Sequence, residues 1–169
     1  MPMNRLPSRF ALGLFALLAL QAQAGDNTFI DEAMSAGMAE IQTSQLALEK
    51  SDAADIKAFA RLMIKDHTQS NQQLLELAKK HDLPAPNDAA LADKARKMML
   101  QVQDGASFDA AYASHQVDAH EQAIRLFDEQ RQSTSAPADL RNFATNALPT
   151  LQHHLQEAKK LENEYRAAE

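Results

Sequence analysis

The sequence predicts an all-α protein, an antiparallel four-helix bundle with one short extra helix that connects its two halves. Apolar residues recur at spacings of three and four along four long stretches, which is the period of a helix with one buried face. The four glycines and six prolines fall mostly between those stretches, where such residues interrupt helices. No stretch alternates between apolar and polar residues, so we expect no β-strand.

The beginning of the chain differs from the rest. Two arginines precede an apolar run over residues 10–20, and the run is followed by Ala-Gln-Ala at 22–24. A short basic stretch, an apolar run of this length and an ending with small residues are typical of a secretory signal peptide. We therefore expect residues 1–24 to be cleaved and residues 25–169 to form a single domain that is periplasmic or secreted.

The bounds of the helices follow from the periodic stretches and the residues between them. The long helices are expected at about 28–50, 53–81, 107–132 and 137–166, and the short helix at about 88–103. Thr28, Asp52 and Ser107 are suited to cap the helices that follow them, and Pro137 suits a first turn. The short turns within each pair of long helices make its members antiparallel.

Composition excludes several classes of function. The net charge is −6 at pH 7 and the lysines are scattered, which argues against a nucleic-acid partner. The chain has no cysteine, so it forms no disulfide bond and carries no lipid anchor on a cysteine. After removal of the signal peptide no apolar run is long enough to span a membrane. Protein partners are not indicated.

Each long helix carries one ionisable residue at the centre of its apolar face, and these residues are Glu40, His67, His120 and His154. Measured from the nearest turn, the two members of each hairpin differ in depth by about one helical turn, at about 1.5 Å per residue. All four side chains are therefore expected to meet in one layer, with Asp66 at its edge. The remaining histidines should be exposed or at helix ends: His81, His115 and His153.

A buried polar group without a partner lowers the free energy of unfolding by about 1–3 kcal/mol. Two arrangements could give the polar groups of this layer their partners. One is a bound transition-metal ion, because imidazole with carboxylate suits zinc, iron or copper rather than calcium. The other is a closed hydrogen-bond network between Glu40 and the histidines that holds the helices in register. The first makes the chain a metal-binding protein, and the second a non-enzymatic structural or interaction module.

Several segments resemble a bacterial exported family that is catalogued as domain of unknown function 4142 and often labelled outer membrane protein. The resemblance covers about residues 28–161 and is carried by segments 39–41, 59–68, 108–112, 118–120 and 148–155. Its most specific piece is Met-x-x-Asp-His-Thr at 63–68. The resemblance implies a ferritin-like bundle but no established activity. The family's polar positions match these residues: Glu40, Asp66, His67, His120 and His154.

Ferritin-like centres that hold two metal ions use a Glu-x-x-His pair on each of two helices. Here Ile64 and Leu151 stand three residues before His67 and His154, so both bridging carboxylates are missing. We therefore expect one transition-metal ion rather than two, and a binding protein rather than an oxidase or another enzyme. The role expected for it is metal handling or stress protection in the cell envelope.

Overall fold

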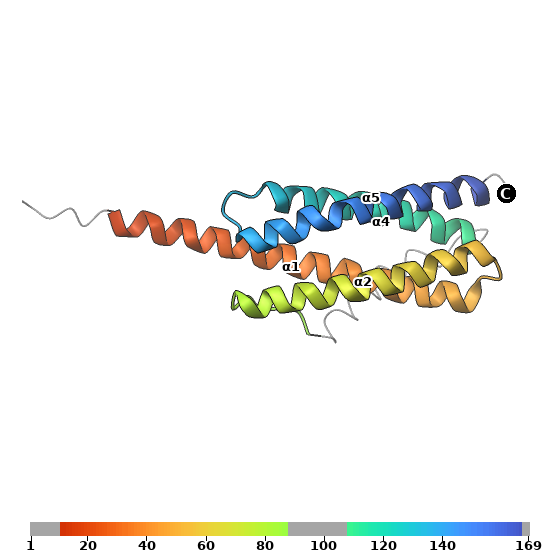
Figure 1. The fold of residues 1–169 in the computed structure, drawn as a ribbon, viewed down its shortest axis with the longest axis horizontal. Coiled ribbons are helices and arrows are strands. Elements are labelled where there is room, and N and C mark those ends of the chain that lie inside the picture. The colour runs from red at the N-terminus through yellow and green to blue at the C-terminus, as the bar shows by residue number, and fades with distance from the viewer. Residues whose placement is uncertain (1–10, 88–107, 167–169) are drawn as a thin grey trace, which may run out of the picture.

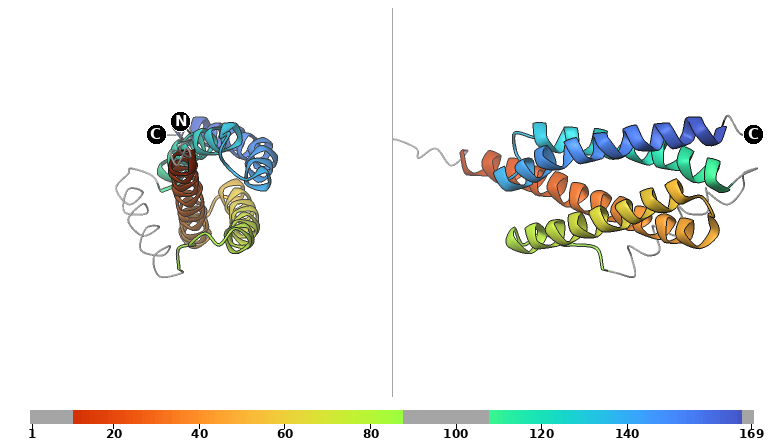
Figure 2. Two further views of the ribbon diagram at one scale, coloured as in Figure 1. Left: turned by 90° about the vertical axis from the view of Figure 1, so that its left-hand side faces the viewer. Right: turned by 45° about the vertical axis from the view of Figure 1, so that its right-hand side comes forward.

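The computed structural model describes residues 11–87 and 108–166, and this part of the chain forms four long helices and no strand. They are α1 (Ala11–Lys50), α2 (Ala54–Lys80), α4 (Phe108–Gln132) and α5 (Ala138–Arg166). The helices lie side by side (Figure 1), and the end-on view in Figure 2 shows one at each corner of a bundle. The predicted all-α four-helix bundle is confirmed. The short helix expected at 88–103 lies outside the described residues.

Hydrogen bonds between helices show that neighbouring helices run antiparallel. The pairs between α2 and α5 are Asp55–Tyr165, Asp66–His154 and Lys80–Asp139. The pairs between α1 and α4 are Asp26–Gln130 and Ser44–Tyr112. In both sets one residue number rises as the other falls, which fixes the register along most of the bundle.

The first helix begins earlier than the sequence predicted. Helix α1 starts at Ala11 rather than near residue 28 and continues without a break, because alanine and leucine favour the helix and Gly25 alone costs only about 1 kcal/mol. Asp26 and Phe29 are buried in the bundle, whereas the earlier part of the ribbon extends past the other helices (Figure 1). Among the described helices, none has the length and apolar character needed to cross a membrane. Cleavage after residue 24 stays a prediction.

The turn between α1 and α2 is held by Ser51 rather than by the predicted cap, Asp52. The backbone N–H of Ala53 donates a hydrogen bond to Ser51 Oγ at 3.1 Å. Ser51 is buried and Asp52 is exposed. The hydroxyl of Ser51 therefore reaches the start of α2, and the prediction for Asp52 is wrong.

The apolar core is divided into two clusters by a polar layer. The cluster near the turn between α4 and α5 includes Phe29, Met34, Leu74, Phe127 and Leu151. The cluster near the turn between α1 and α2 includes Ala47, Met63, Tyr112, Val117 and Ala158. On each helix a buried polar residue falls between the two clusters: Glu40, His67, His120 and His154. The layer that the sequence predicted therefore interrupts the core near its middle.

Candidate metal centre

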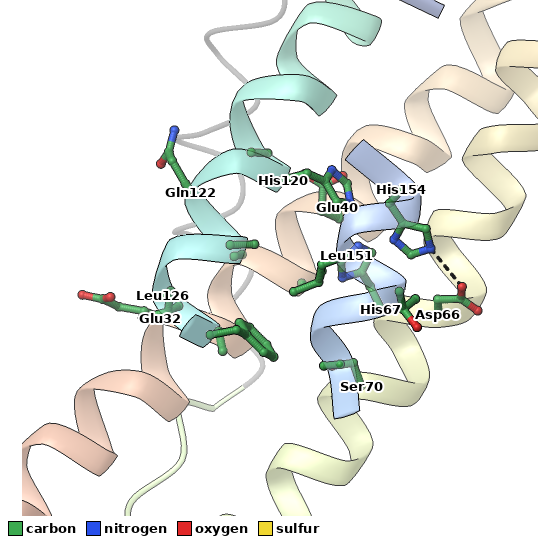
Figure 3. A pocket seen from close by; sticks show the side chains of 18 of the residues that line it. Glu32, Glu40, Asp66, His67, Ser70, His120, Gln122, Leu126, Leu151 and His154 are labelled. Atoms are coloured by element: carbon green, nitrogen blue, oxygen red, sulfur yellow. Dashed lines mark hydrogen bonds and ion pairs between the residues drawn. The ribbon is translucent and has the colours of Figure 1, made fainter. Parts of the chain in front are cut away.

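Three buried histidines from three helices converge in this layer. His67 on α2, His120 on α4 and His154 on α5 are 8%, 1% and 2% exposed. One ring nitrogen from each lies within 4.8 Å of the other two, and the ring centroids are 5.3 to 5.8 Å apart. Figure 3 shows the rings gathered between the helices. The structure thus brings together three of the four predicted residues.

The hydrogen bond of His120 determines which of its nitrogens is free. Its Nδ1 lies 2.8 Å from the backbone oxygen of Gln116. A carbonyl oxygen only accepts, so Nδ1 carries the proton and Nε2 keeps a lone pair. His120 Nε2 is buried and has no hydrogen-bond partner among the described residues.

His154 is oriented by Asp66. Its Nε2 lies 3.1 Å from Asp66 Oδ2 and donates to that carboxylate, which leaves the lone pair on Nδ1. Nδ1 is buried and lacks a partner in the described part of the chain. A histidine that donates one N–H to a carboxylate while its other nitrogen is free is the usual arrangement of a metal ligand. Asp66 lies at the edge of the layer, as predicted, but it pairs with His154 and not with its neighbour His67.

The third nitrogen comes from His67, whose Nε2 is also buried without a partner among residues 11–87 and 108–166. Each ring therefore offers one unpaired nitrogen. A tetrahedral zinc ion with Zn–N distances of about 2.0–2.1 Å needs its nitrogens about 3.3 Å apart. The ligand nitrogens, which lie within 4.8 Å of one another, would have to draw together by at most about 1.5 Å to hold such an ion.

Glu40 is buried, as predicted, but it is not part of this group. Because α1 and α4 are antiparallel and Ser44 bonds Tyr112 at 2.9 Å, Glu40 lies beside Gln116, one turn along α4 from His120. Glu40 Oε2 and both side-chain polar atoms of Gln116 are buried without a hydrogen bond of good geometry to any described residue. A role for Glu40 as a metal ligand stays a prediction.

Sequence reasoning missed Gln116, whose side chain is fully buried and whose carbonyl sets the tautomer of His120. The signal that could have found it is its position four residues before His120, on the same face of α4 as Tyr112. In the sequence alone, however, a single glutamine on an apolar helix face cannot be distinguished from an ordinary polar residue, because its neighbours on the other helices are not known.

The other histidines meet the prediction in two cases of three. His153 is exposed, and His81 lies at the C-terminal end of α2, where it pairs with Asp139 at 2.8 Å. His115 was expected to be exposed, but it is half-buried and its Nε2 has no partner in the described residues. His115 also lines the cavity beside the layer.

Burial perturbs the ionisation of the layer. It lowers the pKa of His67 to about 3, with help from His120 and His154. Burial also lowers the pKa of His120 to about 4, although the Gln116 carbonyl opposes this. The pKa of His154 is lowered by burial against the effect of Asp66. Burial raises the pKa of Glu40 to about 7, with the amide of Gln116 acting in the opposite direction. The imidazoles are therefore neutral at neutral pH, which is the form that binds metal.

These shifts predict that the metal-free protein is less stable at pH 5 than at pH 7. Between about pH 6.5 and 4 the unfolded chain protonates its histidines while the folded protein keeps His67 and His120 neutral. The unfolded state then binds more protons, so the free energy of unfolding falls as the pH falls. Glu40 acts in the opposite sense, because the folded state protonates it first, but one carboxyl does not outweigh several imidazoles.

Urea unfolding with a chelator present at pH 7 and pH 5 measures this effect as a lower midpoint at pH 5. An equal or higher midpoint at pH 5 would show that the buried histidines titrate normally in the folded protein.

Comparison with known proteins identifies the family of this chain but does not indicate a function. The chain matches the family described as domain of unknown function (DUF4142) over residues 17–161, which include every residue of the polar layer. Neither curated proteins nor solved structures give a significant match. Since the match covers most of the chain, this protein belongs to the family of domain of unknown function 4142.

Proposed function

We propose that this protein is an exported metal-binding bundle that holds one transition-metal ion at His67, His120 and His154 and serves in metal handling or stress protection in the cell envelope. The observation that carries the proposal is the set of three unpaired buried nitrogens, one on each ring. Each ring nitrogen left unpaired in the interior costs about 1–3 kcal/mol. One ion satisfies all three at once.

The alternative is a structural or interaction module in which the layer is a hydrogen-bond network. Two bonds favour it: His120 to the Gln116 carbonyl and His154 to Asp66. These bonds do not join the histidines to one another or to Glu40, so among the described residues they do not close a network. Both bonds also orient a ring so that its other nitrogen points inward, which is their function around a metal ion.

The ligands indicate the class of metal. Three imidazoles suit zinc, copper or iron, and three protein ligands leave one tetrahedral position open. Ile64 and Leu151 stand where a two-metal centre would need carboxylates, which supports one ion rather than two. Export is supported by the signal-like pattern of residues 1–24.

Titration of zinc, copper(I), copper(II) and iron(II) into the untagged, metal-free protein tests the proposal. We expect at least one ion to saturate at one per chain. At a free metal concentration of about 100 times Kd, binding adds about 2.7 kcal/mol to the free energy of unfolding. For a domain of this size that raises Tm by about 5–10 °C.

A chelator should reverse the rise in Tm. If no ion binds in a saturable manner and a chelator leaves Tm unchanged, the structural module is the better account.

A further inference from the structure

The candidate metal centre lies at one end of a cavity that is far larger than a metal ion requires. The cavity has a volume of about 930 Å³ and is lined by all four helices. Sites for organic molecules occupy about 300–1,000 Å³. The exposed side chains of Gln73 on α2 and of Asn146 and Thr150 on α5 also line it, so it reaches solvent between these two helices.

Two aromatic rings lie toward the far end of the cavity. From His120 the lining runs about two turns along α4 to Phe127, or about 10 Å, and from His154 it runs about three turns back along α5 to Phe143. The rings of Phe127 and Phe143 are 5.9 Å apart. The cavity therefore has the three histidines at one end and aromatic rings at the other, with Ala147 between them on α5.

The charge of the lining restricts what the cavity accepts. Four carboxyl groups line it, and no lysine or arginine is among the described lining residues. The carboxyl groups belong to Glu32, Glu40, Asp66 and Asp118. Such a lining favours a metal cation but disfavours an anionic organic ligand, because like charges repel.

We propose that the cavity binds a small neutral molecule with a nitrogen donor at one end and an apolar body. The inference rests on the proposed metal site, since the donor takes the coordination position that the three histidines leave open. A nitrogen donor suits the ions that imidazole suits. The apolar body extends past Ala147 toward Phe127 and Phe143, where it leaves water.

Cobalt(II)-loaded protein tests this inference, because the visible absorption of cobalt reports a change of its ligands. The probes are imidazole, 4-phenylimidazole and azide. Each imidazole should change the spectrum in a saturable manner. 4-Phenylimidazole should bind about tenfold or more tightly than imidazole, because its phenyl group becomes buried. Azide should bind more weakly than 4-phenylimidazole.

The variant Ala147→Leu checks where the phenyl group lies. Its added side chain projects into the middle of the cavity, so 4-phenylimidazole should bind about tenfold more weakly. Cobalt and imidazole should bind as before, which also shows that the variant is folded. Ala123→Leu tests the wall of the cavity that α4 forms, because Ala123 on this helix is half-buried and lines the cavity. This variant should likewise weaken the binding of 4-phenylimidazole and leave that of cobalt and imidazole unchanged.

The failures are distinguishable. If cobalt binds at one per chain but no probe changes its spectrum, or both imidazoles bind equally, the cavity inference is wrong and the metal site stands. If no cobalt, zinc, copper or iron binds, both proposals are overturned.

Discussion

Replacing His67 with alanine is expected to lower metal affinity by more than about a hundredfold and to abolish the rise in Tm on metal addition. His67 contributes one of the three unpaired nitrogens, and two imidazoles hold an ion much less firmly than three. Changes to groups that only orient ligands already cost about 10–100-fold in affinity, so loss of a ligand should exceed that. Competition with a chelator of known affinity measures the change.

The stability of the metal-free His67→Ala variant separates the two accounts of the layer. The substitution removes a buried nitrogen that has no partner in the described structure, so a metal site predicts only the loss of stability that comes from the cavity left by the ring. A hydrogen-bond network predicts a loss of about 1–3 kcal/mol for each partner left unpaired. Urea unfolding with a chelator present measures it.

His153→Ala is the matched control for this experiment. His153 is the exposed neighbour of His154 on the same helix, so its loss should change neither metal affinity nor stability. If His153→Ala weakens metal binding as much as His67→Ala does, the ion binds at another place.

Asp66→Asn is expected to lower metal affinity by about 10–100-fold while the protein stays folded. Asp66 accepts a hydrogen bond from His154 Nε2 at 3.1 Å. This bond keeps the lone pair on Nδ1, directed at the other histidines, and makes the imidazole a stronger donor to the metal. An asparagine in this position is neutral. If its amide nitrogen faces His154 Nε2, it donates to that nitrogen and favours the tautomer that carries the proton on Nδ1, which cannot bind a metal through Nδ1.

Asp118→Asn controls for charge alone. Asp118 also lines the cavity, but it makes no hydrogen bond to the three histidines, so the variant removes the same charge without removing the orienting bond. We expect Asp118→Asn to weaken binding far less than Asp66→Asn. Equal effects of both variants would mean that Asp66 acts only through its charge.

The periodicity of the sequence predicted most of the fold. The bounds of α2, α4 and α5 lie within about a residue of those expected, because long apolar stripes with polar turns between them leave few alternatives. The start of α1 could not be predicted in this way. Helix propensity continues through residues 11–24, and propensity does not distinguish a signal segment from the helix that follows it.

The sequence by itself also determined that three of the histidines, His67, His120 and His154, are internal. His67, His120 and His154 stand in apolar stripes with spacings of three and four, and only one rotation of each helix buries its stripe. Counting residues from the turn of each helical hairpin therefore already placed all three histidines near one depth in the bundle.

Only the tertiary structure decided how these side chains meet. Asp66 pairs with His154 across the bundle, Glu40 lies beside Gln116, and His115 borders the cavity. Each of these outcomes would change if one helix slid along its neighbour by about one turn, or rotated about its own axis by a few tens of degrees. A hydrophobic stripe spans about 100° or more of a helix surface, so it identifies the buried face but does not determine which polar atoms on that face come within bonding distance.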